Sequence, residues 1–364
     1  MRLRLGGTKA IIDATIVTSL VLLTSCAKLA PPQPQETIVD TTSHYVAWSI
    51  STLGDVTSSC SDVVITGDGA SWISGVIVRL ESNGNTVQYN AAYWVDTGWV
   101  VTGILFKPCV GIGSGGFDQI PAMISPTTNE IWFSDGIQFL RLSAASRDQI
   151  CYPDSLQNGA LLSLACGGSG DIWGVGYFGA AIHYDGQTWT AGNINTSIHL
   201  IDASESPDRQ RLWACGYKDD KSESALFMHD VSGWHLIAHN PPYQGSEELF
   251  TGVWAADNDS VWVVGNVGVF RFSQKVPYGF RNYGIALSSF PRAIRGTSNS
   301  DVFVVGEQGL VLHYNGATWY KYPFASNPGD FLRRIAVTPH RVIAVGQRYT
   351  NGIENKAVIY DGRR

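Results

Sequence analysis

Histidines beside tyrosines are the first residues in this sequence whose type suggests chemistry. His183 and His313 precede Tyr184 and Tyr314 at equivalent places in two similar stretches. Neutral imidazole is the commonest metal ligand in proteins, but a pairing that recurs indicates a structural role, such as a hydrogen bond to a neighbouring strand. Because the chain also has no HExxH motif and no pair of CxxC motifs, we predict no metal site.

A glycine-rich stretch and several arginines suggest two further kinds of chemistry, phosphate binding and glycoside hydrolysis. The stretch 111–116 could cradle a phosphate, but it lacks the Lys-Ser/Thr ending of a P-loop, so we predict a mobile loop and no cofactor. Glycoside hydrolysis of the sialidase type would need three arginines converging on a carboxylate. The spacing of the arginines assembles no such triad, and we predict no catalytic residue. The arginines considered are Arg79, Arg141, Arg292, Arg295 and Arg333.

Composition places the chain among folded proteins rather than disordered ones. Its 364 residues are 44% hydrophobic and 15% charged, with 39 glycines, 12 tryptophans and 15 tyrosines, which is typical of many short strands joined by tight turns. A net charge of −6 without a basic cluster argues against nucleic acid as a partner. The chain has no apolar run of about eighteen residues, so we expect no transmembrane helix.

The first residues have the pattern of an export signal. Arg2, Arg4 and Lys9 precede the apolar stretch 14–23, which is the layout of a secretory signal peptide. The sequence Leu-Thr-Ser-Cys that ends at Cys26 resembles the bacterial lipobox, in which the cysteine is acylated and the chain is cut before it. The resemblance implies a signal peptide over residues 1–25 and a lipid anchor, palmitate included, on Cys26. A signal peptide with an incidental cysteine is the alternative.

A flexible tether is expected to follow the lipidated cysteine. Residues 26–43 are rich in Pro, Thr and Gln and would hold a folded domain near a bilayer. Several acyl chains on one cysteine form a lasting anchor. Because Ala27 rather than Asp follows the cysteine, the resemblance favours the outer membrane of a Gram-negative cell envelope.

A short phrase of the form acidic–apolar–aromatic–apolar–apolar–Gly recurs along the chain. The clear copies are Asp171–Gly176, Arg211–Gly216, Ser260–Gly265, Asp301–Gly306 and Arg341–Gly346, and the looser copies are Asp62–Gly67 and Glu130–Asp135. From residue 135 onward the copies end 40, 41 or 49 residues apart, and the first step is 68. Asp-Gly or Asn-Gly turns, which favour hairpins, then precede Trp189 and Trp319. We predict one four-stranded antiparallel blade per unit, with the phrase as its second strand.

The two ends of the repeated region complement each other. The last unit stops after its third strand at Gly362, whereas residues 44–50 stand alone before the first unit. We expect these residues to complete the last blade, with Trp48 in the place of Trp189, because closure removes exposed strand edges. The predicted fold is an all-β, seven-bladed β-propeller over residues 44–364 with an insertion at about 93–118. Six or eight blades stay open if that segment is a blade of its own or the first copy is false.

The repeats resemble the Trp-Val-Val-Gly…His-Tyr-Asp-Gly-x-x-Trp propeller repeats of many bacterial lipoproteins and, more distantly, the photosystem II assembly-factor propellers. The resemblance implies the fold more than the function, since propellers carry unrelated activities. We expect a lipid-anchored protein-binding or assembly scaffold whose partner is another envelope protein or a membrane complex. Glycan recognition is the alternative, because aromatic residues are frequent, and a sialidase-like or lyase propeller enzyme is the third hypothesis.

One face of the propeller is predicted to bind. The residues just after each phrase glycine vary from unit to unit, as specificity-bearing loops on a rigid scaffold do, although ordinary solvent-facing turns would look the same. The candidates are Asp68, Tyr177, Tyr217, Asn266, Glu307 and Gln347, together with Tyr243 in a loop between blades. The aromatic-rich stretch Tyr93–Trp99 is the other candidate surface.

Export would expose five cysteines beyond Cys26 to oxidising conditions. Cys215 replaces a valine inside a phrase, so we expect it to be a buried, inert thiol. The simplest pairing of the remaining four joins Cys60 to Cys109 and Cys151 to Cys166.

Overall fold

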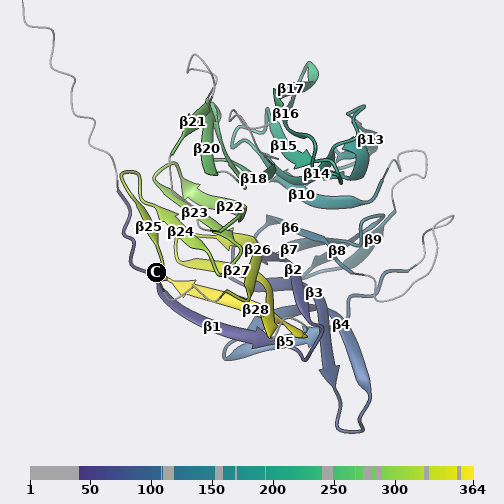
Figure 1. Ribbon diagram of the computed structural model, residues 1–364. Coiled ribbons are helices and arrows are strands. Elements are labelled where there is room, and N and C mark those ends of the chain that lie inside the picture. The colour runs from purple at the N-terminus through teal and green to yellow at the C-terminus, as the bar shows by residue number, and fades with distance from the viewer. Residues whose placement is uncertain are drawn as a thin grey trace, which may run out of the picture. The chain divides into compact units, whose positions relative to one another are not determined.

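The computed structural model describes residues 41–107, 109, 119–151, 159–168, 170–192, 194–239, 249–266, 268–273, 280–283, 289–323, 328–350 and 354–364. In these residues the strands form seven antiparallel four-stranded sheets (Figure 1). The predicted seven-bladed propeller is therefore confirmed, and neither six nor eight blades applies. No helix in the described ranges is long and apolar enough to cross a membrane. The predicted signal peptide, Cys26 and most of the tether lie outside these ranges.

Each blade is a meander, and its strands have the following bounds. Blade 1 comprises β2 (Ser59–Ile65), β3 (Ser71–Leu80), β4 (Thr86–Val95) and β5 (Gly98–Thr102). Blade 2 comprises β6 (Ala122–Thr127), β7 (Glu130–Ser134), β8 (Phe139–Ser143) and β9 (Arg147–Ile150). Blade 3 comprises β10 (Leu161–Gly168), β11 (Asp171–Gly176), β12 (Ala181–Tyr184) and β13 (Trp189–Ala191). Blade 4 comprises β14 (His199–Glu205), β15 (Leu212–Tyr217), β16 (Ser224–Asp230) and β17 (Gly233–His239).

The remaining blades follow the same plan. Blade 5 comprises β18 (Phe250–Ala255), β19 (Ser260–Gly265), β20 (Gly268–Ser273) and β21 (Phe280–Asn282). Blade 6 comprises β22 (Pro291–Ser298), β23 (Asp301–Gly306), β24 (Val311–Tyr314) and β25 (Trp319–Lys321). Blade 7 comprises β26 (Asp330–Val337), β27 (Arg341–Thr350) and β28 (Glu354–Arg363), with β1 (Ala47–Leu53) as its outermost strand.

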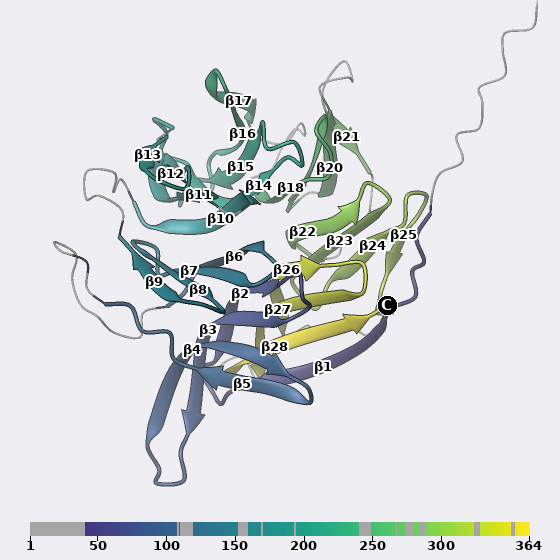
Figure 2. The same cartoon turned by 180° about the vertical axis from the view of Figure 1, so that it is seen from behind.

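The ring is closed by the two ends of the repeated region. β1 pairs with β28 along its whole length, with Trp48 opposite Gly362, and both views show the purple strand beside the yellow one (Figures 1 and 2). The expected closing strand is present, but it begins three residues later than predicted, at Ala47. The first strands of adjacent blades contact each other around the ring, and β26 contacts β2.

Seven apolar clusters, one between each pair of adjacent blades, make up the core. Tryptophans of the outer strands contribute at equivalent places. Trp48 packs between blades 6 and 7, Trp189 between blades 2 and 3, and Trp319 between blades 5 and 6. Trp48 therefore packs between two blades as the other two tryptophans do, but its register differs: it lies opposite Gly362, whereas Trp189 and Trp319 lie opposite Tyr184 and Tyr314.

The repeated phrase forms the second strand in six blades but not in blade 1. The five clear copies are β11, β15, β19, β23 and the first part of β27, and the looser copy Glu130–Asp135 covers β7. The copy Asp62–Gly67 is wrong, because its strand part belongs to β2, the first strand of its blade. The second strand there is β3, in which Gly75 approaches the Ser59 carbonyl as a phrase glycine does.

The extra length of blade 1 is also placed differently from the prediction. Tyr93 and Trp94 belong to β4 and Trp99 to β5, so the start of the expected insertion at 93–118 is ordinary blade. The described part of the extra chain begins after Thr102. In addition, β3 and β4 form a long hairpin that projects away from the other sheets (Figure 2). A break in their register between Ser74 and Ile77 lies near its base.

Candidate functional site

The first strand of six blades contains an extra residue just after it begins. The pairing with the second strand slips at one residue in each case: Ser61, Leu162, Ile201, Thr251, Arg292 and Arg333. A β-bulge of this kind re-aims a side chain and is common beside functional sites. All six residues line one cavity, and Pro121, just before β6, lines it from blade 2.

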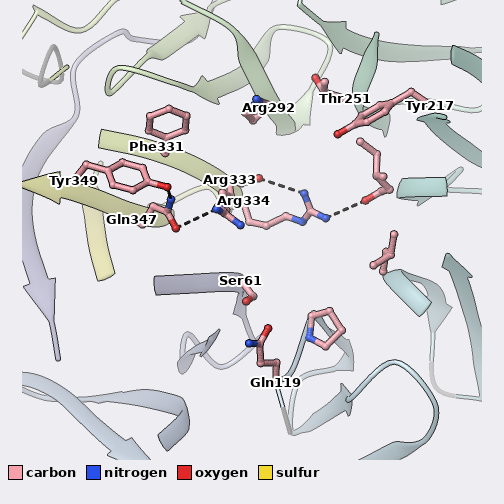
Figure 3. Close-up of a pocket in the computed structure, with 13 residues that line it drawn as sticks. Ser61, Gln119, Tyr217, Thr251, Arg292, Phe331, Arg333, Arg334, Gln347 and Tyr349 are labelled. Carbon is pink, nitrogen blue, oxygen red and sulfur yellow. Dashed lines mark hydrogen bonds between the residues drawn. The ribbon is translucent and has the colours of Figure 1, made fainter. Parts of the chain in front are cut away.

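This cavity, the channel mouth, is defined by those seven side chains, one from each blade. It has a volume of about 460 Å³ and lies at the end of the central channel where the first strands begin and the second strands end. Gln119, Tyr217, Phe331, Arg334, Gln347 and Tyr349 complete its wall (Figure 3). A cavity of this size suits a small ligand or one or two side chains.

Guanidinium groups dominate the charge of the channel mouth. Arg292 donates from Nε to Oε1 of Glu307 at 3.0 Å. Arg333 donates to Oε1 of Gln347 at 3.0 Å, and the Gln347 amide in turn donates to the Tyr349 hydroxyl. Arg334 reaches across the channel and donates to the Ile201 carbonyl at 2.9 Å (Figure 3). The wall can therefore bind an anion, and it holds its cations in fixed places.

Deeper in the channel the charges are paired. Arg295 forms an ion pair with Asp202 at 2.8 Å. Burial is the largest single influence on the pKa of Asp202 and raises it, but Arg295, Arg334 and the Val253 N–H together lower it below its usual range. Asp62 accepts from the backbone N–H groups of Val63 and Met123, both at 2.8 Å. Burial nevertheless raises the pKa of Asp62, although Arg334 opposes the shift.

Five predicted site residues lie at the expected end of the propeller. Tyr217 and Gln347 line the channel mouth, and Glu307 holds Arg292 there. Tyr177 is exposed beside it on blade 3. The Asn266 side chain accepts from the Leu249 N–H at 2.8 Å, so it also fastens its turn to the first strand.

One predicted residue stands apart from the channel mouth, and another lies outside the described residues. Asp68 lies in the turn between β2 and β3, where its Oδ1 accepts from the Ala70 N–H at 3.1 Å. First strands end at this turn, so Asp68 is at the opposite end of the channel, and its expected place beside the other candidates is wrong. This follows from the false phrase copy. Tyr243 lies outside the described residues, as does the stretch 111–116.

Sequence reasoning missed the main feature of the site. It considered Arg292 and Arg333 but expected no convergence of arginines, whereas these two and Arg334 line the same cavity. The signal available was positional: each bulged residue follows the first residues of the innermost strand. Recognising it needed the pairing register, because a bulge leaves no fixed residue type. The Tyr349 hydroxyl accepts from the Gln347 amide, which is not the acidic partner of a Tyr that the sialidase hypothesis requires.

The two repeated histidines have the structural role expected of them. His183 Nε2 lies 2.7 Å from Oδ1 of Asp171, and His313 Nε2 lies 2.9 Å from Oδ1 of Asp301. In both blades the partner opens the phrase on the neighbouring strand. Among the described residues, no group of three or more His, Cys, Asp or Glu side chains could hold a metal ion.

The disulfide differs from the predicted pairing. Cys109 is bonded to Cys151, while Cys60 and Cys166 are free thiols. The expected pairs Cys60–Cys109 and Cys151–Cys166 are therefore wrong. Cys60 lies in β2 within the core between blades 7 and 1, out of reach of the outer segment that carries Cys109. Cys215 is buried, as predicted.

The fold and the channel mouth define a seven-bladed β-propeller with a cationic central cavity. It is similar to the structure of YCF48 bound to a D1 peptide, with a TM-score of 0.64 and 14% identity over 89% of this chain and 97% of that one. It is also similar to the WD40 propeller domain of Doa1, with a TM-score of 0.58 and 13% identity over 88% and 98%.

An enzyme is among the similar structures as well. The inactivated virginiamycin B lyase of Staphylococcus aureus, solved with quinupristin, has a TM-score of 0.56 and 13% identity over 86% of this chain and 99% of that one. No protein-family model matches the chain, and no curated protein matches it. At these identities the likeness shows the fold alone.

Proposed function

We propose that this chain is a lipid-anchored propeller of the cell envelope that binds a segment of a partner protein at the channel mouth. The observation that carries the proposal is the ring of seven wall residues, one from each blade. Bulges direct six of them into the cavity. Such a preformed concave site on a rigid scaffold can bind a ligand with little loss of conformational entropy in the protein.

Two further observations support the parts of this proposal. The lipobox-like residues before Cys26 favour the anchor, the exported location and an outer-membrane position in a Gram-negative cell. A propeller of similar fold has been solved with a bound peptide, which supports a protein partner, such as a membrane complex whose assembly the chain assists.

Cross-linking from one residue of the channel mouth tests the binding half. A photoreactive p-benzoylphenylalanine replaces Gln119, which is exposed at the mouth, or Asp68, which is exposed at the opposite end of the channel, in the tagged protein in its own membranes. We expect one envelope protein to be captured from position 119 and not from 68, with its cross-linked peptide identified by mass spectrometry. Equal capture from both positions, or capture from 68 alone, would overturn the proposal.

The anchor has its own test. Cys26→Ala should abolish incorporation of labelled palmitate and move the protein out of the membrane fraction. Retention of the variant in salt-washed membranes would contradict lipid anchoring.

A glycan is the second candidate ligand, because the rings of Tyr217 and Tyr349 lie in the wall together with polar groups. Saturable binding to a glycan array that Arg333→Gln abolishes would favour it. Turnover of a bound glycan in the same array would favour the lyase or hydrolase hypothesis instead.

A further inference from the structure

The channel mouth has two unlike sides. Blades 2, 3 and 4 contribute Pro121, Leu162 and Ile201, which are apolar. Blades 5, 6, 7 and 1 contribute Thr251, Arg292, Arg333 and Ser61, which are polar or cationic. These are equivalent positions of one repeat, so the fold itself does not require the difference. At these seven positions a ligand that covers the mouth meets an apolar arc on one side and a polar and cationic arc on the other, and the Arg334 side chain extends between them to the Ile201 carbonyl.

Arg333 and Arg334 differ from the other two arginines in having no carboxylate partner among the described residues, and Arg333 is the more exposed of the two. Arg292 is paired with Glu307 and Arg295 with Asp202, and Arg334 donates to the Ile201 carbonyl. Arg333 has only the neutral amide of Gln347, with no carboxylate within ion-pair distance in the described part of the chain. Its side chain is exposed at the mouth. A guanidinium held in one place by a neutral group can form the bidentate pair that carboxylates favour.

The surroundings of Arg333 also favour an incoming anion. Arg333 is accessible to solvent but is surrounded by the walls of the mouth, and this partial burial lowers its pKa. The charges of Arg292 and Arg334 lower the pKa further, although Tyr349 opposes them. A carboxylate bound there would relieve this repulsion between like charges.

The apolar arc continues outward over blade 3 as a pair of exposed rings. Tyr177 and Phe178 are 38% and 55% exposed, and their ring centroids lie 4.8 and 4.7 Å from that of His199. Phe178 has a φ of 55°, which is unfavourable for a bulky residue. Its N–H donates to Nδ1 of His199 at 3.0 Å. An aromatic side chain held exposed in a strained turn is more typical of a contact surface than of a folding requirement.

We propose that the segment recognised here is an acidic–apolar one: an Asp or Glu side chain pairs with Arg333, and an aliphatic or aromatic side chain packs on Leu162, Ile201 and Phe178. This inference rests on the proposed function, because it names the chemistry of the partner segment. The proposal commits to a side-chain carboxylate within the segment, and peptides blocked at both ends distinguish it from a carboxylate at the chain end. The cavity of about 460 Å³ takes side chains of such a segment but not a folded domain.

A positional-scanning library of fluorescent hexapeptides, blocked at both ends, tests the inference on the full-length protein. We expect the wild-type protein to prefer Asp or Glu over Asn or Gln at one position by at least tenfold in Kd. It should prefer an aliphatic or aromatic residue over Ser at a second position. A wild-type protein that shows no acidic preference, or binds no blocked peptide, overturns the inference. Binding only to peptides with a free carboxyl end also overturns it, because the source is then the chain end.

Matched variants connect the preference to the residues. Arg333→Gln should remove the acidic preference and keep the apolar one, whereas Arg79→Gln, an exposed arginine on the β3–β4 hairpin, should keep both. Phe178→Ser should raise the Kd by the same several-fold factor for peptides with Asp or Glu and for peptides with Asn or Gln at that position. An acidic preference that survives in Arg333→Gln would contradict the proposal. If the segment cross-linked through position 119 has no acidic residue, this inference fails while the proposed function stands.

Discussion

The glycine that ends each phrase is required by a close approach of two backbones. A Cβ atom built on Gly265 would overlap the carbonyl oxygen of Leu249, and the same holds at the other four clear copies. The next residue, Asn266, donates its N–H to that carbonyl at 3.2 Å, so the second strand is drawn onto the start of the first. The repeated glycine is thus the sequence signal of the contact that forms the channel mouth.

Replacing this glycine should therefore cost stability. We expect Gly265→Ala to lower the free energy of unfolding by about 1–3 kcal/mol, as overpacking does. The matched control is Gly98→Ala in β5, where an added Cβ meets no atom within 4 Å and the change should stay within about 0.5 kcal/mol. Urea unfolding followed by tryptophan fluorescence measures both. Equal effects at the two positions would show that strand propensity, not the close approach, decides.

Asp301 gives the stability a pH dependence of known sign. Burial alone would raise the pKa of Asp301, but hydrogen bonds from His313, Arg364 and Thr297 lower it to about 2, against 3.8 for the ordinary group. The folded state therefore favours the charged form. This stability, about 2 kcal/mol for such a shift, is present above pH 4 and is lost as the pH falls towards 2.

A substitution should reveal that dependence. Asp301→Asn is expected to unfold at lower urea concentration than the wild type at pH 7, and the gap should narrow at pH 3 and below. Parallel urea titrations at the two pH values measure it. A gap of constant size would mean that the charge of Asp301 contributes nothing and that only its shape matters.

At the scale of elements, closure of the propeller depends on β1, a strand that precedes the first blade in the sequence and pairs with the last one. β1 supplies Trp48 to the cluster between blades 6 and 7. We expect Trp48→Ala to lower the free energy of unfolding of the propeller by about 2–3 kcal/mol. This is less than for a fully buried tryptophan, because the Trp48 indole is only partly buried. Tyr45→Ala, in the same segment but with 77% of its side chain exposed, is the control and should be near neutral.

Calorimetry of Trp48→Ala and its control Tyr45→Ala shows whether the closing strand stabilises the whole propeller or only blade 7. Trp48→Ala should lower the midpoint temperature of a single cooperative unfolding transition, because the contacts that it removes join the last blade to its neighbour. A separate early transition for blade 7 would mean that closure stabilises that blade alone.

Strands with a strong local pattern could be predicted from sequence, whereas strand registers that depend on distant contacts could not. The phrase, the Asp-Gly turns and Trp48 place nearly every blade, because each is a local signal repeated at a fixed spacing. Blade 1 misled because Asp62–Gly67 has the pattern of a second strand, although it pairs as a first strand. The bulges at the channel mouth depend on how the seven first strands pack around the central axis. The sequence of a single segment does not predict that packing.

At the scale of the whole molecule, the cysteines show why spacing alone misled. Cys109 and Cys151 are 42 residues apart and join the chain after blade 1 to the chain after blade 2. The predicted partners, Cys60 and Cys166, belong to first strands inside the ring. Burial raises the pKa of Cys60 to about 12, and burial with the nearby charges of Glu205 and Asp171 does the same for Cys166.

These positions predict a definite order of thiol reactivity. A thiol with a pKa near 12 is only about one part in ten thousand thiolate at pH 8, and the thiolate is the form that reacts. In a Cys26→Ala background, iodoacetamide at pH 8 should modify Cys60 and Cys215 only after unfolding and the half-buried Cys166 slowly. Reduction should expose Cys109 and Cys151 and lower the free energy of unfolding by about 2–4 kcal/mol. Peptide mapping measures each site, and a disulfide-linked peptide containing Cys60 in the native protein would contradict its assignment as a buried free thiol in the first strand of blade 1.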